Sequence, residues 1–256
     1  SIIVIIAAAV TSGAKDIVNN PLIHITPNVV INSQLLAASY EASVKKLLFI
    51  SSAAAYPNLG KKILEEDDMM KGDPENVYFA AGWMKRYSEI LCYTYAKKIS
   101  EPLTTIVVRP TNIYGPGDKI DWDKSHVTAA TIRKVIERHQ PIKVWGDGKE
   151  VRDLIYIDDF VNGTLLALEH CKKFLNINIG SGVSYNIDHI LYLTLKIDNF
   201  QNPTIQYLKD APKTAKSIKI SIKKANDLLN FKPNIDLQTG IKKTITWMKK
   251  ELISIN

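Results

Sequence analysis

The chain has 256 residues, of which 46% are hydrophobic and 23% are charged. This composition excludes an intrinsically disordered chain, and the length allows a sizeable core without disulfide or metal cross-links. A net charge of +7 could indicate a nucleic-acid or membrane partner, but the lysines fall in scattered pairs that are typical of a solvated surface. We therefore expect neither nucleic acid nor membrane as a partner.

The cysteines and the apolar start of the chain bear on its location. Cys92 and Cys171 fit no metal-ligand spacing, so no metal site is expected, and a reducing cytoplasmic location is the simplest interpretation. Residues 1–10 are apolar but lack the basic residues of a signal peptide. They are also shorter than the ~18 residues of a membrane span, so they are interpreted as a buried strand.

Strand and helix patterns alternate along the chain. Short apolar runs predict buried strands at 2–8, 46–50, 103–108, 142–144 and 175–179. Helical spacing of apolar residues predicts helices at 28–41, 77–98, 127–138, 157–169, 187–195, 220–229 and 237–249. The alternation predicts an α/β fold with a parallel sheet, and without a Gly/Ser linker any second domain is woven from the same chain.

Ligands bind at the carboxyl ends of the strands in such a sheet. Three predicted strand ends carry polar or small residues, at 8–13, 51–57 and 109–112. A strand that ends in hydroxyl groups, followed by a helix with Tyr and Lys, suggests proton transfer at a substrate hydroxyl or carbonyl. The serine would orient the oxygen, and the tyrosine would move the proton while the lysine lowers its pKa.

Several motifs follow one another in the order of a known family. Residues 49–57 resemble the serine strand of extended short-chain dehydrogenases/reductases, and residues 109–118 resemble their substrate loop. Further matches lie at 125–127, 144–148, 152–159, 178–182 and 239–247. Because these motifs are collinear over the whole chain, it is similar to the NAD-dependent epimerases/dehydratases, and to GDP-L-fucose synthases in particular.

The resemblance implies a Rossmann-like parallel sheet, here with its N-terminal βαβα portion missing, and a smaller interwoven α/β substrate domain. Residues 1–110 would be the remaining dinucleotide-binding part. Residues 111–256 would bind substrate, with a segment near 150–190 returning to the first domain. The sequence contains no Gly-x-x-Gly-x-x-Gly loop. Either the chain is a fragment, which we expect, or a domain has lost this mode of dinucleotide binding.

The resemblance also implies catalytic roles for Ser52 and Lys85. The family tyrosine stands four residues before the lysine, on the same helix face, but here that position is Ala81. Tyr78, two turns from Lys85, could take its place with the help of an irregularity at Gly82. Otherwise the acid/base is absent and Tyr78 is a packing aromatic.

A second departure concerns epimerisation. The family pairs a cysteine, two positions after the catalytic serine, with the histidine of a Ser-His-Val motif. Here Ala54 replaces the cysteine, whereas His126 is kept. The two-base chemistry is therefore in doubt. His126 is expected either to act in catalysis or only to bind substrate.

The remaining site residues are implied by their motif positions. For the cofactor, NAD or NADP, these residues are Ala8, Ala9, Ser51, Lys85, Pro110 and Thr111. For the nucleotide-sugar they are Asn112, His126, Trp145 and Arg152. Arg152 suits a pyrophosphate because its planar fork donates two parallel hydrogen bonds; an ion pair with Asp153 or Asp158 is the alternative. Asn28 would open the first helix in a structural role.

These motifs lead to an expected function and its alternative. We expect an NAD(P)-dependent nucleotide-sugar epimerase, dehydratase or reductase that transfers a hydride at a sugar carbon. A homodimer through the helices at 28–41 and 77–98 is implied by the resemblance. The alternative is a catalytically impaired or non-enzymatic binding protein of the same fold, which Ala54, Ala81 and the absent glycine loop favour.

Overall fold

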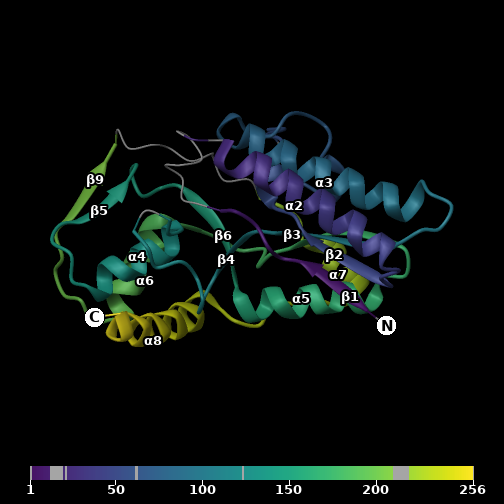
Figure 1. Ribbon diagram of the computed structural model, residues 1–256. Coiled ribbons are helices and arrows are strands. Elements are labelled where there is room, and N and C mark those ends of the chain that lie inside the picture. Colours follow the sequence, from purple (N-terminus) through teal and green to yellow (C-terminus); the bar gives the residue numbers. More distant parts are fainter. Residues whose placement is uncertain are drawn as a thin grey trace.

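A four-stranded parallel sheet forms the centre of one half of the molecule (Figure 1). The computed structural model describes residues 2–11, 20, 22–60, 63–122, 124–209 and 219–255. The strands hydrogen-bond in the order β1 (Ile3–Ile6), β2 (Lys46–Ile50), β3 (Thr104–Pro110) and β7 (Phe174–Ile179). All three pairings are parallel, so the predicted α/β fold with a parallel sheet is confirmed.

Helices cover both faces of this sheet (Figure 1). One face carries α2 (Leu22–Glu41) and α3 (Phe79–Lys97), and the other carries α5 (Ile157–His170) and α7 (Lys223–Leu229). The central strands β2 and β3 are apolar at 47–50 and 106–108, because both of their faces are buried there. Leu47 packs toward α2 and α3, whereas Leu48 packs toward α5 and α7.

β1 is less buried than its sequence predicts. Ile6 lies in the core with Leu36 and Phe49, but Ile3 and Ile5 are each 46% exposed. The physical reason is position: among the described strands β1 pairs only with β2, so it lies at a sheet edge. An apolar run predicts a strand. Whether both faces of that strand are buried depends on the elements that pack beside it, which the run itself does not reveal.

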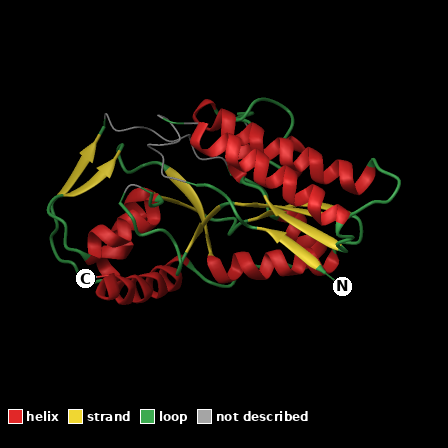
Figure 2. Cartoon of the chain, viewed as in Figure 1, coloured by secondary structure: helices red, strands yellow, loops and turns green. Residues whose placement is uncertain are grey.

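The second half of the molecule is built around a smaller core. A three-stranded sheet contains β4 (Asn112–Tyr114), β6 (Val151–Tyr156) and β8 (Ser184–Asn186), and a separate parallel pair contains β5 (Ile142–Trp145) and β9 (Ile205–Leu208). Three helices, α4 (Val127–Ile136), α6 (Ile187–Ile197) and α8 (Leu237–Ile255), pack together beside these strands (Figure 2). Buried side chains from all three helices, such as Ile132, Leu191 and Ile241, form one continuous apolar cluster.

The first helix begins earlier than expected. α2 starts at Leu22 and includes Pro27, so Asn28 lies inside the helix rather than opening it. The Asn28 side chain accepts a hydrogen bond from the Val10 amide (2.8 Å) and donates one to the Val10 carbonyl (2.9 Å). It thereby holds the segment after β1 against α2, in agreement with the expected structural role.

The start of α3 also differs from the expectation. A 3-10 turn covers Asn76–Tyr78, and the α-helix then runs from Phe79 to Lys97 without a break at Gly82. The irregularity proposed at Gly82 is therefore wrong; the change in helix type lies at Tyr78. Gly82 serves close packing instead, because a Cβ atom there would lie 2.5 Å from the Pro74 Cβ. In the part of the chain that the structure describes, no helix is long and apolar enough to cross a bilayer.

Candidate active site

The strand ends bring several expected site residues to one edge of the sheet. Ser51 and Ser52 follow β2, Pro110 and Thr111 stand at the end of β3, and Ala8 and Ala9 follow β1. Because β1, β2 and β3 are parallel neighbours, these residues share the edge where ligands bind in such sheets. Ala8 and Ala9 are exposed there, whereas Pro110 and Thr111 are buried.

Contacts from α3 hold the turn that carries Ser52. Ser52 caps a short 3-10 turn, and its Oγ accepts a hydrogen bond from the Ala54 amide at 3.1 Å. On one side of this turn, Lys85 Nζ donates to the Ile50 carbonyl at 2.8 Å. On the other side, Arg86 Nε donates to the Ala55 carbonyl at 2.8 Å. One helix therefore positions the backbone both before and after Ser52.

Lys85 is a half-buried amine directly behind this turn. Its Nζ lies 4.9 Å from the centre of the Phe49 ring. Burial lowers the pKa of Lys85 from its ordinary value to about 8, and the nearby Glu89 carboxylate limits that fall. The ammonium form therefore still prevails at neutral pH, and the proton is lost within the mildly alkaline range.

The sequence did not indicate a buried polar network under the site. Arg109 donates to both Glu89 carboxylate oxygens, with a shortest Nη2–Oε2 distance of 2.6 Å. Ser51 Oγ donates to Oε1 of the same carboxylate. Arg109 also donates to the Tyr56 hydroxyl, and Tyr56 donates to Asn178 on β7 at 2.7 Å. The network therefore connects α3 with the ends of β2, β3 and β7.

Tyr78 lies near Arg152 and Glu150. Burial raises the pKa of the Tyr78 phenol, and the charge of Arg152 partly offsets that rise. Arg152 Nη2 lies 3.3 Å from Glu150 Oε2, and its Nη1 donates to the Val151 carbonyl. Glu150 is therefore a partner of Arg152 that the sequence analysis did not name.

Asn112 and Asp153 connect the end of β3 with β6. Asn112 is exposed, and its amide donates to the Asp153 carbonyl at 3.0 Å. The Asp153 carboxylate points the other way and accepts hydrogen bonds from the Ser181 amide (3.1 Å) and the Gly182 amide (3.2 Å). These contacts place Asn112 and Arg152 on neighbouring strands of the same small sheet.

His126 forms a pair with Asp118 at the start of α4. Its Nδ1 lies 3.1 Å from Asp118 Oδ1, and this contact is the main cause that raises the pKa of His126. The imidazole is 59% exposed, so its other nitrogen is accessible. Lys119 extends from the same loop and donates to the Thr11 carbonyl at 2.7 Å, which links this loop to the segment after β1.

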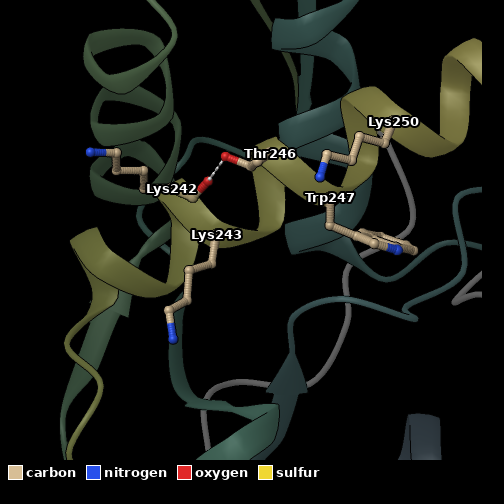
Figure 3. Close-up of a pocket in the computed structure, with 5 residues that line it drawn as sticks. All are labelled: Lys242, Lys243, Thr246, Trp247 and Lys250. Atoms are coloured by element: carbon tan, nitrogen blue, oxygen red, sulfur yellow. Dashed lines mark hydrogen bonds between the residues drawn. The ribbon is translucent and has the colours of Figure 1, made fainter.

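Trp145 lies apart from the other expected substrate residues. It ends β5 in the separate β5–β9 pair, far from β1 in Figure 1, and is 45% exposed. Gly146 and Gly148 have φ angles of 76° and 75°, as expected for a turn after the strand. A shallow hollow of about 340 Å³ lies on α8, and Figure 3 shows its lining residues, Lys242, Lys243, Thr246, Trp247 and Lys250. None of the predicted site residues lines this hollow.

The fold and the residues at its strand ends define the class of Rossmann-like α/β enzymes related to short-chain dehydrogenases. A family model described as the NAD dependent epimerase/dehydratase family matches residues 1–180. The chain therefore belongs to the NAD-dependent epimerase/dehydratase family, which confirms the resemblance stated from the motifs.

Individual relatives are distant but similar over nearly the whole chain. Probable GDP-L-fucose synthase 1 of Oryza sativa subsp. japonica is 27% identical, with 98% of this chain and 77% of the relative covered. UDP-glucuronate 4-epimerase of Thermodesulfobacterium geofontis is 29% identical, with 98% and 74% covered. The family model shows the family, and relatives of below 30% identity do not show the substrate.

Solved structures agree with the fold. UDP-glucose 4-epimerase of Thermotoga maritima, in a complex with UDP-glucose, has a TM-score of 0.85 at 26% identity, with 98% of this chain and 78% of that chain covered. UDP-glucuronic acid 4-epimerase of Bacillus cereus, in a complex with UDP-glucuronic acid and NAD, has a TM-score of 0.82 at 27% identity, with 96% and 74% covered. The cofactor expectation of NAD or NADP therefore agrees with the family and with a bound NAD in a relative.

Proposed function

We propose that this protein is an NAD(P)-dependent enzyme that acts on a nucleotide-sugar, as an epimerase, a dehydratase or a reductase. The observation that carries the proposal is the shared placement of Ser52 and Lys85 at the end of β2. Lys85 donates to the Ile50 carbonyl, two residues before Ser52. In this arrangement the Ser52 hydroxyl can orient a substrate oxygen, and the Lys85 ammonium can stabilise negative charge beside it.

The residues present fit the nicotinamide end of the cofactor. Lys85 offers a half-buried ammonium for a ribose hydroxyl, and the small exposed Ala8 and Ala9 leave space above β1. Pro110 and Thr111 would border the ring through backbone groups. When bound, NAD(P) supplies a hydride acceptor and donor at a sugar carbon. The protein residues orient the sugar oxygen and move its proton.

The substrate side of the proposal uses the second half of the molecule. Arg152 would hold the pyrophosphate, with Asn112 beside it on the neighbouring strand. The electrostatic effect of Arg152 on the Tyr78 phenol indicates that the two side chains lie near each other, which supports a position beside the same ligand. His126, oriented by Asp118, would bind the sugar or exchange a proton with it. Trp145 is the weakest of these assignments because it stands on the separate strand pair.

The test is turnover of nucleotide-sugars by the purified protein with added NAD or NADP. Product formation and absorbance at 340 nm are followed with GDP-, UDP- and dTDP-sugars. Ser52→Ala is expected to lower turnover by about 10²-fold, because an oriented hydrogen bond to the reacting oxygen is lost. Ser254→Ala, at an exposed position in α8, is the matched control and leaves the rate unchanged. Equal rates for both variants would contradict the role of Ser52.

A second candidate function rests on Ala81 and Ala54. Neither side chain can move a proton, so the chain lacks two of the acid/base groups that the family pattern implies. A binding protein that recognises a nucleotide-sugar without converting it would also lack these acid/base groups. Calorimetric binding of a nucleotide-sugar with no turnover in any cofactor state would favour this second function.

We also propose a division into two domains and a cytoplasmic location. The assignment of 1–110 to cofactor binding and 111–256 to substrate binding is supported by β7, which pairs with β3 and so returns to the first sheet. A cytoplasmic location is supported by Cys92 and Cys171, which are both buried as free thiols.

An exposed apolar stripe supports a homodimer through α2 and α3. On α3 the side chains of Phe79, Tyr87 and Ile90 are 48%, 47% and 45% exposed and recur at helical spacing. Such stripes mark interaction surfaces more often than free surface. We expect light scattering to give about twice the chain mass of 28.7 kDa. Ile90→Glu is expected to give the monomer.

A matched control separates the interface from a general effect of charge. Ile253 on α8 is 77% exposed, so Ile253→Glu adds the same charge on another face and should leave the dimer intact. A wild-type protein at the monomer mass at micromolar concentration would contradict the dimer.

A further inference from the structure

The buried carboxylate of Glu89 lies where three parts of the candidate site meet. It is one helical turn beyond Lys85 on α3. Its Oε1 accepts from Ser51 Oγ and from Arg109 Nε, at 3.1 Å for the latter, and its Oε2 accepts from Arg109 Nη2 at 2.6 Å. Glu89 is 9% exposed, and Ser51 and Arg109 are each 3% exposed. These are protein contacts on both carboxylate oxygens, so Glu89 is held in one position.

The contacts act on the two residues that precede Ser52. Glu89 holds the Ser51 side chain, and Lys85 holds the Ile50 carbonyl. Together the two residues of α3 tie down the end of β2 immediately before the Ser52 turn. A shift of either contact would move the Ser52 hydroxyl relative to the Lys85 ammonium.

Charge around Lys85 has one main source. The charged groups near this corner are Glu89 and Arg86 on α3, Arg109 at the end of β3, and Glu66 in the turn beneath Arg109. Of these groups, Glu89 is the one whose charge raises the pKa of Lys85 against the effect of burial. Arg109 contacts Glu89 directly and keeps a full positive charge beside it.

We propose that Glu89 is the positioning residue of this site, which seats Ser52 through Ser51 and places its negative charge one helical turn from Lys85. Glu89 does not touch the reacting atoms in this arrangement; it acts through its two neighbours. The inference rests on the proposed function for its purpose, but the contacts and the charge effect can be measured without cofactor or substrate.

The charge effect is tested by the pH dependence of Lys85 acylation. Amines react as the free base, so the midpoint of labelling by a water-soluble acylating reagent, read by peptide mass spectrometry, reports the Lys85 pKa. Glu89→Gln keeps the shape and an acceptor for Ser51 but removes the charge. The midpoint is expected to fall by roughly one pH unit. Lys97, exposed at the end of the same helix, is the internal reference.

The seating effect is tested by amide hydrogen exchange of residues 52–56. Ser51→Ala removes the contact with Glu89 but leaves the carboxylate beside Lys85. Exchange at 52–56 is expected to rise by about tenfold, which corresponds to one ordinary hydrogen bond, while the Lys85 midpoint stays unchanged. Glu101→Gln, at an exposed site, should change neither reading.

Glu89→Gln is expected to change the Lys85 midpoint, and Ser51→Ala is expected to change the exchange at 52–56 without changing that midpoint. This pattern distinguishes a positioning role from a general loss of stability. An unchanged Lys85 midpoint in Glu89→Gln, or unchanged exchange in Ser51→Ala, overturns the proposal. If Glu89→Gln does not fold, Glu89→Asp takes its place: it retains the charge, and a Lys85 midpoint shifted by a full unit would overturn the role. Because no ligand is used, absence of nucleotide-sugar turnover would refute the proposed function and leave these readings intact.

Discussion

Restoring a tyrosine at position 81 is expected to raise nucleotide-sugar turnover by about 10²- to 10⁴-fold, the contribution of a positioned acid/base. Ala81 stands one helical turn before Lys85 on the same face of α3. A phenol there would lie beside the Lys85 ammonium, which lowers the pKa of such a group by its opposite charge in the ionised state. The measurement is product formation by Ala81→Tyr and wild type with NAD(P) and a nucleotide-sugar.

Two further variants decide where the proton is moved. Ala80→Tyr adds the same ring one position earlier, about a quarter turn around the helix, and is expected to give no activation. Tyr78→Phe removes the other candidate phenol. If wild type is already active and Tyr78→Phe abolishes that activity, Tyr78 is the acid/base. An Ala81→Tyr protein that folds, binds the nucleotide-sugar and remains inactive would contradict a missing proton donor.

Loss of Arg109 is expected to lower the free energy of unfolding by about 3–5 kcal/mol. Arg109→Met leaves the buried Glu89 carboxylate without its ion pair, and it removes the donor to the Tyr56 hydroxyl. Breaking one side of a buried pair is costly because the remaining charge stays in a medium that solvates it poorly. Urea denaturation monitored by circular dichroism measures the change.

An exposed pair and a double variant serve as controls. Lys223 and Asp227 form an i,i+4 pair whose side chains are 74% and 51% exposed, so Lys223→Met should leave the urea midpoint almost unchanged. The double variant Arg109→Met with Glu89→Leu removes both charges and should be more stable than Arg109→Met alone. A single variant that is as stable as wild type would show that the network does not support the fold.

The central strands could be predicted from the sequence because their burial is a local property. Helices cover both faces of β2, and four of its five residues are apolar, which marks it as a buried strand. β1 has equally apolar residues, but Ile3 and Ile5 are exposed because a neighbour decides their burial. Proline usually interrupts a helix, but α2 extends through Pro27 because the helix packs on α3 and on the segment after β1.

In the second half of the molecule β5 was predicted at 142–144, whereas the short strands β4, β6, β8 and β9 were not. β6 contains Arg152 and Asp153, and its burial does not alternate along the strand, so its sequence shows neither of the usual strand patterns. Arg152 contacts Glu150, which lies just before β6, whereas the Asp153 carboxylate accepts hydrogen bonds from the Ser181 and Gly182 amides. The partners of these two adjacent residues are therefore set by packing and not by their order in the sequence.

The motif residues of the candidate site could be predicted from the sequence, but the buried network that holds them in place could not. Motif order placed Ser52 and Lys85, and the structure brings both to the end of β2. The network of Glu89 and Arg109 joins residues 20 positions apart in sequence, and a single acidic residue on a helix usually faces solvent. Only the packing of α3 onto the strand ends reveals that this carboxylate is buried.

The cofactor content of the purified protein tests the central claim most directly. The protein is denatured gently, and the released small molecules are identified by absorbance and mass spectrometry, with binding of added NAD and NADP measured in parallel by calorimetry. An NAD(P)-dependent enzyme predicts released cofactor, or saturable binding of one equivalent per chain that Lys85→Met weakens. A protein that releases neither nucleotide and binds neither at millimolar concentration would contradict the proposed function.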